Sequence, residues 1–281
     1  MRILVTGAGG QVGHELVEVF RDHDVVALAH GQLDLADRDA VLGAITSAAP
    51  DVVVNAAAYT AVDACETEID TAWAVNALGV RHVADGARRV GAHVCHLSTD
   101  YVFDGTRPDP YVEWDLPAPA SMYGRSKLGG ERELGPADTI VRTSWVCGYH
   151  GGNMVKTVLR LAGEHDSLSF VADQRGHPTF ADDLAGVIRR LVVERRGGLF
   201  HVTNQGAVSW FEFARAVLVA AGLDPDRVAP IATADLHPAR PAPRPANSVL
   251  DNAALRLSGL PLAPDFHEPL ERLVARLRRD R

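Results

Sequence analysis

The sequence has few cysteines, no excess of positive charge and no long apolar run, and each absence excludes a class of protein. Its three cysteines, Cys65, Cys95 and Cys147, are odd in number and widely spaced, so they form neither a disulfide framework nor a metal-ligand pattern. A formal net charge of -8 argues against a nucleic-acid-binding surface. No apolar run is long enough to cross a bilayer, and a strand is predicted directly behind Met1, which leaves no room for a signal peptide. We therefore expect a cytoplasmic protein and predict no metal site and no nucleic-acid or membrane partner.

The remaining composition is that of an ordinary globular protein, with 47% hydrophobic and 23% charged residues in a chain of 281. Short apolar runs alternate with amphipathic segments through the first half of the chain. This alternation predicts an α/β protein with a Rossmann-type doubly wound parallel sheet. Beyond Trp145 the predicted elements are shorter and less regular, and a proline-rich loop covers residues 235–245. We predict an NAD(P)-binding Rossmann domain over residues 1–145 and a smaller, interleaved substrate-binding lobe over residues 146–281.

A glycine-rich turn follows the first apolar run, residues 2–6, and opens an amphipathic helix. In this context Gly7 allows the tight turn, Gly10 lets backbone N–H groups approach a pyrophosphate, and Gly13 lets the helix pack closely on the strand. The spacing is G-x-x-G-x-x-G, and the strand–turn–helix order around it predicts a dinucleotide site.

The second predicted strand, residues 24–29, ends without a carboxylate that could bind both hydroxyls of an adenosine ribose, as NAD sites usually require. The sequence therefore favours NADPH, with NADH as the alternative. His30 lies either near a 2′-phosphate or in a surface loop. Asp34 lies either at the adenine amino group or in a turn before a helix that begins near Asp37. The small residues from Ala56 to Ala58, which follow a third strand, allow either a flat ligand or a closely packed helix.

Tyr123 and Lys127 are four residues apart and therefore lie on one face of a predicted helix. A lysine ammonium near a phenol favours the phenolate and lowers its pKa by roughly 1–3, so such a tyrosine can transfer a proton near neutral pH. Thr99 lies at the end of a fourth predicted strand, residues 92–97. Together with a dinucleotide site, these residues predict hydride transfer to a ketone. Thr99 would hold the ketone oxygen, Tyr123 would deliver the proton, and Lys127 would tune Tyr123 and bind the nicotinamide ribose.

Three further segments around these residues have predicted structures. Residues 63–90 are expected to form one long helix, with Glu66 as an acid in its first turn and Asn76 either bonded to backbone at a bend or facing solvent. The loop over residues 103–119 is long, proline-rich and aromatic, as loops that cover a substrate often are. The glycines at 129–130 cost a helix roughly 1 kcal/mol each relative to alanine, so we expect the tyrosine helix to be loose or short there.

These motifs resemble those of the extended short-chain dehydrogenase/reductase family, and the finer resemblance is to its dTDP-4-dehydrorhamnose reductases. The similar stretches cover nearly the whole chain. They are Gly7–Gly13, Val54–Asp63, Ser98–Gly105, Tyr123–Lys127, Arg142–Val146, Gly152–Asn153, Asp173–Thr179, His201–Asn204, Ser209–Trp210 and Arg244–Leu250. Several of them are particular to these reductases rather than to the wider family.

The resemblance implies NAD(P)H-dependent reduction of the C4 ketone of a dTDP-4-keto-6-deoxy sugar, dTDP-4-dehydro-6-deoxy-L-mannose, to dTDP-L-rhamnose, by a monomer or homodimer. It implies that the cofactor is lined by Gly10, Gln11, Val12, Asp34, Leu35, Ala58, Tyr59 and Thr60. It implies that the sugar is faced by Thr99, Asp100, Tyr123 and Trp145. Trp145 is either an apolar wall of the sugar site or a core residue. Arg244 is either a ligand of the substrate diphosphate, because its fork of donors suits phosphate oxygens, or a solvated loop residue.

Other interpretations use the same fold. Dehydratases of this superfamily have an Asp-Glu pair after the threonine, whereas this chain has Asp100-Tyr101, which argues against dehydration. A related ketoreductase that makes another deoxysugar stays open, as does a non-catalytic regulatory subunit. The complete set of Thr99, Tyr123 and Lys127 argues for catalysis.

Overall fold

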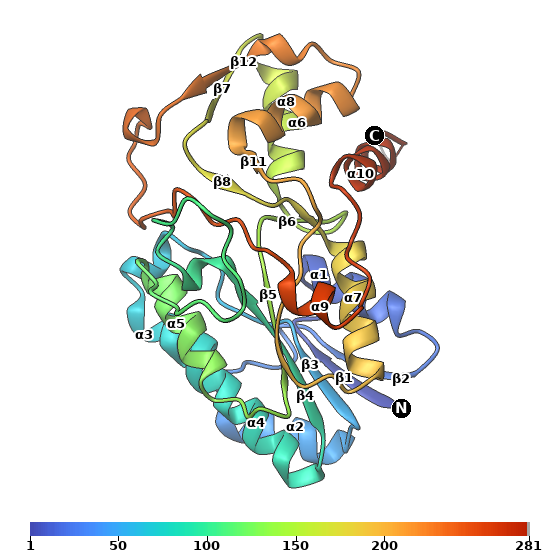
Figure 1. The fold of residues 1–281 in the computed structure, drawn as a ribbon. Helices are drawn as coiled ribbons and strands as arrows, with labels where there is room; N and C mark the ends of the chain where they lie inside the picture. Colours follow the sequence, from blue (N-terminus) through green and yellow to red (C-terminus); the bar gives the residue numbers. More distant parts are fainter. Residues whose placement is uncertain (280–281) are drawn as a thin grey trace.

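The computed structural model describes residues 1–279, and a sheet of six strands in the order β10-β5-β4-β3-β1-β2 forms its centre (Figure 1). The strands are β1 (Arg2–Thr6), β2 (Asp24–Leu28), β3 (Val52–Asn55), β4 (His93–Thr99), β5 (Thr139–Thr143) and β10 (Gly198–His201). Every neighbouring pair is parallel. The chain passes from β1 to β2 on one side and then to β3 on the other, which creates a topological switch point. The predicted Rossmann-type doubly wound sheet is confirmed.

Helices cover both faces of this sheet, and the alternation of side chains along each strand explains why (Figure 1). Val52 and Val54 of β3 are fully buried in one core with α1 and α7, whereas Val53 is fully buried in a second core with α2 and α4. The covering helices are α1 (Gln11–Val19), α2 (Arg38–Ala48), α4 (Gly79–Val90), α5 (Met122–Glu131) and α7 (Ala181–Val193). A strand that is apolar on both faces needs a helical layer on each side.

A second lobe lies beyond the carboxyl edge of the sheet and has its own apolar core (Figure 1). Its helices are α6 (Met154–Glu164), α8 (Trp210–Ala220) and α10 (His267–Arg279). Its strand pairs are β7 (Leu168–Val171) with β12 (Val228–Ile231), β8 (Arg175–Gly176) with β11 (Val208–Ser209), and β6 (Val146–Cys147) with β9 (Thr179–Phe180). Ser209 caps α8 and forms a capping box with Glu212: each side chain accepts the backbone N–H of the other residue.

The two lobes are interleaved along the chain. Helix α7 and strand β10 follow residue 145, yet both belong to the layers of the large sheet, as does the short helix α9 (Ala253–Leu257) that packs on β10. A division of function at residue 145 therefore stays a prediction, and positions 280 and 281 of the predicted lobe lie outside the described residues. Among residues 1–279, no helix is both long enough and apolar enough to cross a membrane.

The segment 63–90 is not one helix, and that prediction is wrong. It consists of a 3₁₀ turn η1 (Ala64–Glu66), helix α3 (Ile69–Trp73), a π-helical segment η2 (Ala74–Leu78) and α4. Asn76 lies in the π-helical segment and is buried. Its side chain accepts the backbone N–H of Tyr59 at 2.8 Å and donates to the Ser126 hydroxyl at 3.0 Å. Asn76 thus bonds backbone at a bend and ties the segment after β3 to helix α5. π-helical segments are frequent at functional sites.

Helix α5 runs unbroken through Gly129 and Gly130, contrary to the expectation of a loose or short helix. A β-carbon at 129 would lie 2.7 Å from the ring of Trp73, and one at 130 would lie 2.2 Å from the backbone oxygen of Asn76. Only glycine lets α5 pack this closely against α3 and η2. The gain in packing offsets the low helix propensity of the two residues.

Candidate active site

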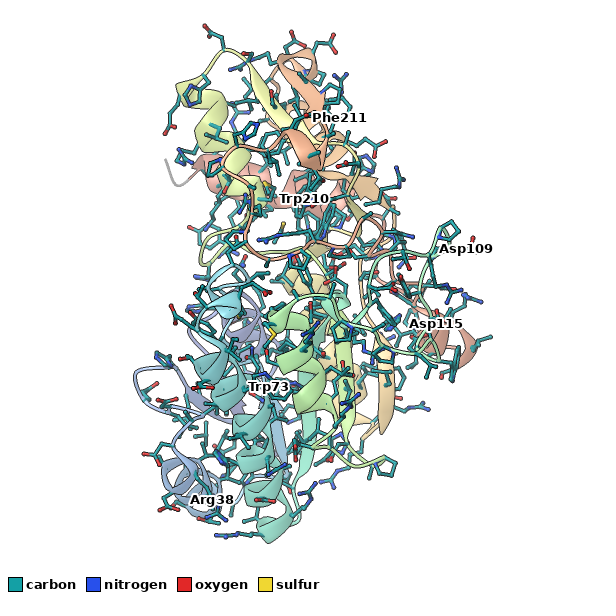
Figure 2. All side chains as sticks on the ribbon, turned by 90° about the vertical axis from the view of Figure 1, so that its left-hand side faces the viewer. Arg38, Trp73, Asp109, Asp115, Trp210 and Phe211 are labelled. Carbon is teal, nitrogen blue, oxygen red and sulfur yellow. The ribbon has the colours of Figure 1, made fainter. Side chains whose placement is uncertain are left out.

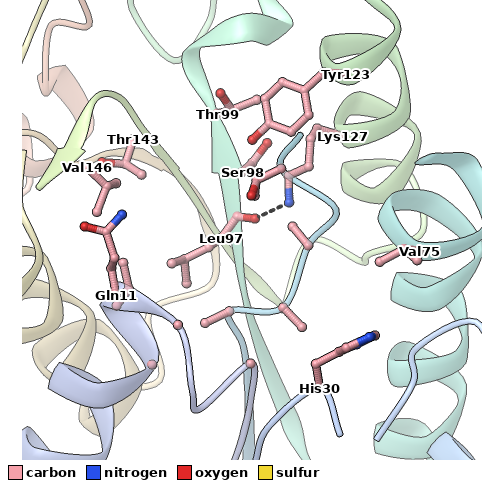
Figure 3. Close-up of a pocket in the computed structure, with 18 of the residues that line it drawn as sticks. Gln11, His30, Val75, Leu97, Ser98, Thr99, Tyr123, Lys127, Thr143 and Val146 are labelled. Atoms are coloured by element: carbon pink, nitrogen blue, oxygen red, sulfur yellow. Dashed lines mark hydrogen bonds between the residues drawn. The ribbon is translucent and has the colours of Figure 1, made fainter. Parts of the chain in front are cut away.

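A cavity of about 810 Å³ opens at the carboxyl ends of β1, β3, β4 and β5, where open α/β sheets bind ligands (Figure 3). Its walls come from both lobes, because Trp145 and Trp210 complete the lining. The predicted site residues that line it are Gly7, Gly10, Gln11, Val12, Asp34, Leu35, Ala56, Ala58, Thr60, Thr99, Asp100, Tyr123, Lys127 and Trp145. Residues predicted separately for cofactor and sugar therefore share one cavity.

The glycine turn is shaped by contacts that a side chain would block. Gly7 has a left-handed φ of 69°, and a β-carbon there would lie 2.6 Å from the backbone nitrogen of Ala57. A β-carbon at Gly13 would lie 2.1 Å from the backbone oxygen of Gly7. Gly10 caps α1, and the first residues of that helix, Gln11 and Val12, line the cavity. Such a helix N-terminus suits a dinucleotide diphosphate.

The cavity beyond β2 is lined by Ala29, His30 and Gly31 rather than by an acid directly after the strand. His30 is exposed and lines the cavity, so it is both a surface residue and a neighbour of any ligand there. Asp34 accepts the backbone N–H of Ala36 at 2.9 Å, which is a turn interaction, and it also lines the cavity. The cap of α2 is Asp37, and the helix begins at Arg38, close to the predicted start.

Gln11 joins the two lobes at the cavity. Its side-chain oxygen accepts the backbone N–H of Gly148 at 2.9 Å and the side-chain amide of Asn153 at 3.0 Å. Asn153 is also the cap of α6. The first residue of α1 therefore fixes the start of the second lobe as well as lining the cavity.

Thr99, Tyr123 and Lys127 are brought together, as predicted (Figure 3). Thr99 ends β4, where its hydroxyl donates to Asp100 at 2.9 Å. Tyr123 lies in the first turn of α5, which Ser121 caps, and its ring packs edge-on against Tyr101. The side-chain nitrogen of Lys127 lies 2.6 Å from the backbone oxygen of Leu97, to which it donates.

Glu66 supports the start of α5 rather than the helix in which it was expected. Its carboxylate lies in η1 and accepts the backbone N–H of Met122, the first residue of α5, at 2.8 Å. This bond satisfies one of the free N–H groups at the beginning of the tyrosine helix.

The electrostatic tuning differs from the prediction. Burial raises the pKa of Tyr123 above its ordinary value, and the Thr99 hydroxyl opposes that rise only in part. Burial also lowers the pKa of Lys127 to about 8, while Glu131 acts in the opposite direction. The expected lowering of the Tyr123 pKa by Lys127 is therefore wrong for this structure. Removal of both groups from water outweighs their proximity.

Asp100 is a buried carboxyl group beside the proposed reaction centre. Burial raises its pKa to about 6, and the hydrogen bond from Thr99 is among the contacts that limit the rise. One carboxyl oxygen accepts from Thr99, and the other is buried without a hydrogen-bond partner among the described residues. A buried oxygen of this kind suits contact with a polar group of a ligand.

Trp145 forms a wall of the cavity together with Trp210, the first residue of α8. Figure 2 shows Trp210 at the junction of the lobes. Trp145 is therefore a half-buried cavity residue rather than a core residue, and its contact with a sugar stays a prediction.

Tyr59 and Arg244 lie outside the cavity lining. The Tyr59 hydroxyl donates to Glu68 at 2.9 Å. The Arg244 guanidinium is largely buried and donates to both carboxylate oxygens of Asp63, one of them at 2.8 Å. Arg244 is therefore not a solvated loop residue, and its contact with a substrate diphosphate stays a prediction.

Sequence reasoning missed several lining residues, among them Gly9, Val62, Ser98, Tyr101 and Trp210. Gly9, Ser98 and Tyr101 are sequence neighbours of predicted site residues, and that adjacency could have indicated that they line the cavity. Trp210 directly follows Ser209, the cap of α8, and nothing local in the sequence indicates that it meets Trp145.

The loop over residues 103–119 does not cover the cavity. Phe103 stacks on Tyr111 at 4.2 Å, and Tyr111 pairs with Leu250 of the C-terminal segment. Figure 2 shows Asp109 and Asp115 of this loop at the edge of the molecule. Phe103 and Tyr111 therefore anchor the loop, and no residue of 103–119 lines the cavity.

Comparison with known proteins gives consistent matches. The family described as RmlD substrate binding domain matches residues 1–279. A dTDP-4-dehydrorhamnose reductase of Aggregatibacter actinomycetemcomitans is 43% identical over 267 residues, covering 89% of this chain and 90% of that protein. A probable dTDP-4,6-dihydroxy-2-methyloxan-3-one 4-ketoreductase of Streptomyces antibioticus is 41% identical over 279 residues, covering 96% and 93%. The crystal structure of dTDP-4-dehydrorhamnose reductase from Bacillus anthracis str. Ames in complex with NADP has a TM-score of 0.93 and 39% identity, covering 98% of this chain and 99% of that one.

Proposed function

The chain belongs to the RmlD family of dTDP-4-dehydrorhamnose reductases, and we infer that it reduces dTDP-4-dehydro-6-deoxy-L-mannose at C4 to give dTDP-L-rhamnose. One observation carries this inference: the hydroxyls of Thr99 and Tyr123 line the same cavity as the glycine turn around Gly10. The turn can hold the diphosphate of a dinucleotide, and the hydroxyls can hold a ketone oxygen. A cofactor and a keto sugar can therefore meet in this cavity.

Hydride transfer places negative charge on the ketone oxygen. This chain has a side chain that can hold that oxygen and another that can protonate it. When bound, the reduced nicotinamide supplies the hydride. The Thr99 hydroxyl donates to Asp100 in the free protein and must turn to donate to the ketone oxygen. The raised pKa of Tyr123 keeps the phenol protonated at neutral pH, so it holds the proton that the developing alkoxide takes. Lys127 lies one helical turn away and can contact the nicotinamide ribose.

NADPH is the proposed cofactor, with NADH as the alternative. The turn at Gly7 and Gly10 and the start of α1 fit a diphosphate. The residues after β2 include His30 and lack an acid directly after the strand, which suits a 2′-phosphate better than free ribose hydroxyls. The relative from Bacillus anthracis was crystallised with NADP, which supports the same choice.

A second candidate is a ketoreductase for a different dTDP-4-keto-6-deoxy sugar. The relative from Streptomyces antibioticus, named as such a 4-ketoreductase, is nearly as similar as the rhamnose-forming relative. The two reactions use the same chemistry and differ in the sugar that fits the cavity. A non-catalytic regulatory subunit is disfavoured, because Thr99, Tyr123 and Lys127 are all in place.

We further propose that the protein works in the cytoplasm, as a monomer or a homodimer, on a nucleotide-sugar substrate. The test of function is incubation of the purified protein with the 4-keto-L-sugar and NADPH or NADH, followed by NMR analysis of the product. We expect oxidation of NADPH and formation of dTDP-L-rhamnose, and Tyr123→Phe should remove most of the rate. A different deoxysugar would favour the second candidate. No turnover with any dTDP-4-keto-6-deoxy sugar would exclude both.

A further inference from the structure

A line of buried polar side chains runs beneath the cavity from the sheet to Lys127. Thr6 of β1, Asn55 of β3 and His96 of β4 have no exposed surface, and Lys127 is 2% exposed. The Thr6 hydroxyl lies 2.7 Å from the Asn55 oxygen, the Asn55 amide nitrogen lies 3.1 Å from Nδ1 of His96, and Nε2 of His96 lies 3.4 Å from the Lys127 nitrogen. Buried polar groups are costly unless they are bonded, so this line calls for a function.

The contacts of Asn55 determine which nitrogen of His96 carries a proton. The Asn55 oxygen lies 3.2 Å from the backbone N–H of Ala57, which can only donate. The oxygen of the amide must therefore face Ala57 and Thr6, and its nitrogen must face His96. Because that nitrogen donates, Nδ1 of His96 accepts. A neutral imidazole has a single N–H, so the proton of His96 lies on Nε2. Burial holds the pKa of His96 well below its usual range, which keeps the ring neutral.

The Nε2–H of His96 consequently points at the amine of Lys127 (Figure 3 shows the lysine beside the end of β4). An ammonium has donors and no lone pair, so two donors would face each other. A neutral amine can accept from Nε2–H while donating to the backbone oxygen of Leu97. Glu131, one turn along α5, favours the ammonium, but its carboxylate is shared with the buried guanidinium of Arg142.

We propose that Asn55 and His96 are positioning residues that set the protonation state of Lys127: Asn55 fixes the Nε2–H tautomer of His96, and that N–H opposes the charged form of the lysine. This makes Lys127 a group that gains and loses a proton within the working pH range. The low pKa of Lys127 agrees with this assignment. The other titratable groups nearby are Tyr123 on the same helix and Asp100 beside Thr99. The tautomer and the lysine titration stand on the geometry alone, and only their catalytic consequence rests on the proposed reductase activity.

The sequence makes a direct measurement feasible, because Lys127 and Lys156 are its two lysines. Lysine labelled with ¹³C at Cε gives one signal for each, and Lys156→Arg identifies the signal of Lys127. We expect Lys127 to titrate well below the ordinary lysine value of about 10.4. In Asn55→Asp the new carboxylate can accept from Nδ1–H, which moves the proton of His96 away from Lys127. We expect the Lys127 midpoint to rise by about one pH unit or more, a tenfold change in its proton dissociation constant.

Thr6→Val is the matched control, since it removes a buried polar group at the far end of the line and leaves the Asn55–His96 pair intact. Its Lys127 midpoint should match that of the unaltered protein. An equal rise in Thr6→Val, or no rise in folded Asn55→Asp, would overturn the proposal. A rise in Asn55→Asp without a change in the His96 tautomer would also overturn it, because a simple charge effect would then suffice.

The tautomer of His96 can be read in the unaltered protein, and a variant serves only to identify its signals. The ring ¹⁵N shifts of His96, identified by the signals lost in His96→Gln, should show a neutral Nε2–H ring from about pH 5 to about pH 9. An Nδ1–H ring or a titrating imidazolium would contradict the proposal. These spectra need no substrate, so a failure of the tautomer assignment is separate from a failure of the keto-sugar assay.

Discussion

Trp145 and Trp210 stack face to face where the lobes meet, with ring centroids 3.4 Å apart and ring planes at 10°. Trp145 adopts a left-handed backbone conformation with φ at 46°. Its indole fits against Gly176, where a β-carbon would lie 2.6 Å from the ring. A left-handed non-glycine residue costs about 1–3 kcal/mol and persists where its surroundings hold it. The stack therefore places an aromatic wall at the mouth of the second lobe at some cost in backbone energy.

Trp210→Ala should weaken binding of the nucleotide sugar more than it slows the chemical step. The variant removes half of the aromatic wall and leaves Thr99 and Tyr123 unchanged. We expect KM for the keto sugar to rise about tenfold, with a smaller change in kcat, as steady-state kinetics would show. Trp210→Phe keeps an aromatic face and should recover most of the affinity. Equal KM values for Trp210→Ala and the unaltered enzyme would show that the aromatic wall does not contribute to binding of the keto sugar.

Gly130→Ala should destabilise the protein, although alanine is the better helix former. The new β-carbon would overlap the backbone oxygen of Asn76, and we expect a loss of about 1–3 kcal/mol in the free energy of unfolding. Gly186→Ala is the matched control, because Gly186 is exposed in α7 with nothing within 4 Å of its β-carbon. That variant should gain about 0.5–1 kcal/mol. Urea unfolding measures both, and a stabilised Gly130→Ala would contradict the packing account.

Local patterns in the sequence were sufficient to predict the doubly wound sheet and several residues that meet at its carboxyl edge. The Gly7 turn depends on strand–turn–helix order, and Tyr123 and Lys127 depend on helical spacing. Both are short-range properties of the chain. The same reasoning failed for residues 63–90, because the π-helical bend at Asn76 is set by bonds to Tyr59 and Ser126, far away in the sequence.

Tertiary contacts also reversed several local expectations. By helix propensity alone, the glycines at 129–130 should weaken α5. In the structure glycine is needed there, because Trp73 packs directly against α5. The pKa of Tyr123 follows burial rather than the nearby Lys127. Trp210 could not be placed, because its partner Trp145 lies in another element. Burial and long-range packing are the quantities that one sequence without a structure does not supply.

Glu131→Gln should strongly destabilise the protein. Arg142 and Glu131 form a two-pronged ion pair, with contacts of 2.8 and 2.7 Å, and their side chains are 3% and 7% exposed. Removing one charge leaves the Arg142 guanidinium buried without its counter-ion, which typically costs 3–5 kcal/mol, about the upper range for a single substitution. The double variant Glu131→Leu with Arg142→Met should lose much less in urea unfolding. An equal loss in both would show that packing, rather than charge, dominates.

Asp63→Asn should remove a pH-dependent part of stability that lies in the acid range. The hydrogen bonds from Arg244 lower the pKa of Asp63 to about 2, against about 4 in an unfolded chain. Because the folded pKa is the lower one, this stabilisation is present above about pH 4 and is lost as the pH falls toward 2. The pair joins residue 63 to the proline-rich loop that carries Arg244.

Urea unfolding at several pH values measures this effect. Between about pH 4 and about pH 2, the free energy of unfolding should fall less in Asp63→Asn than in the unaltered protein. Asp109→Asn, at an exposed loop position, should retain the full loss. Identical pH dependence in Asp63→Asn and Asp109→Asn would mean that the Asp63–Arg244 pair does not hold the loop in solution.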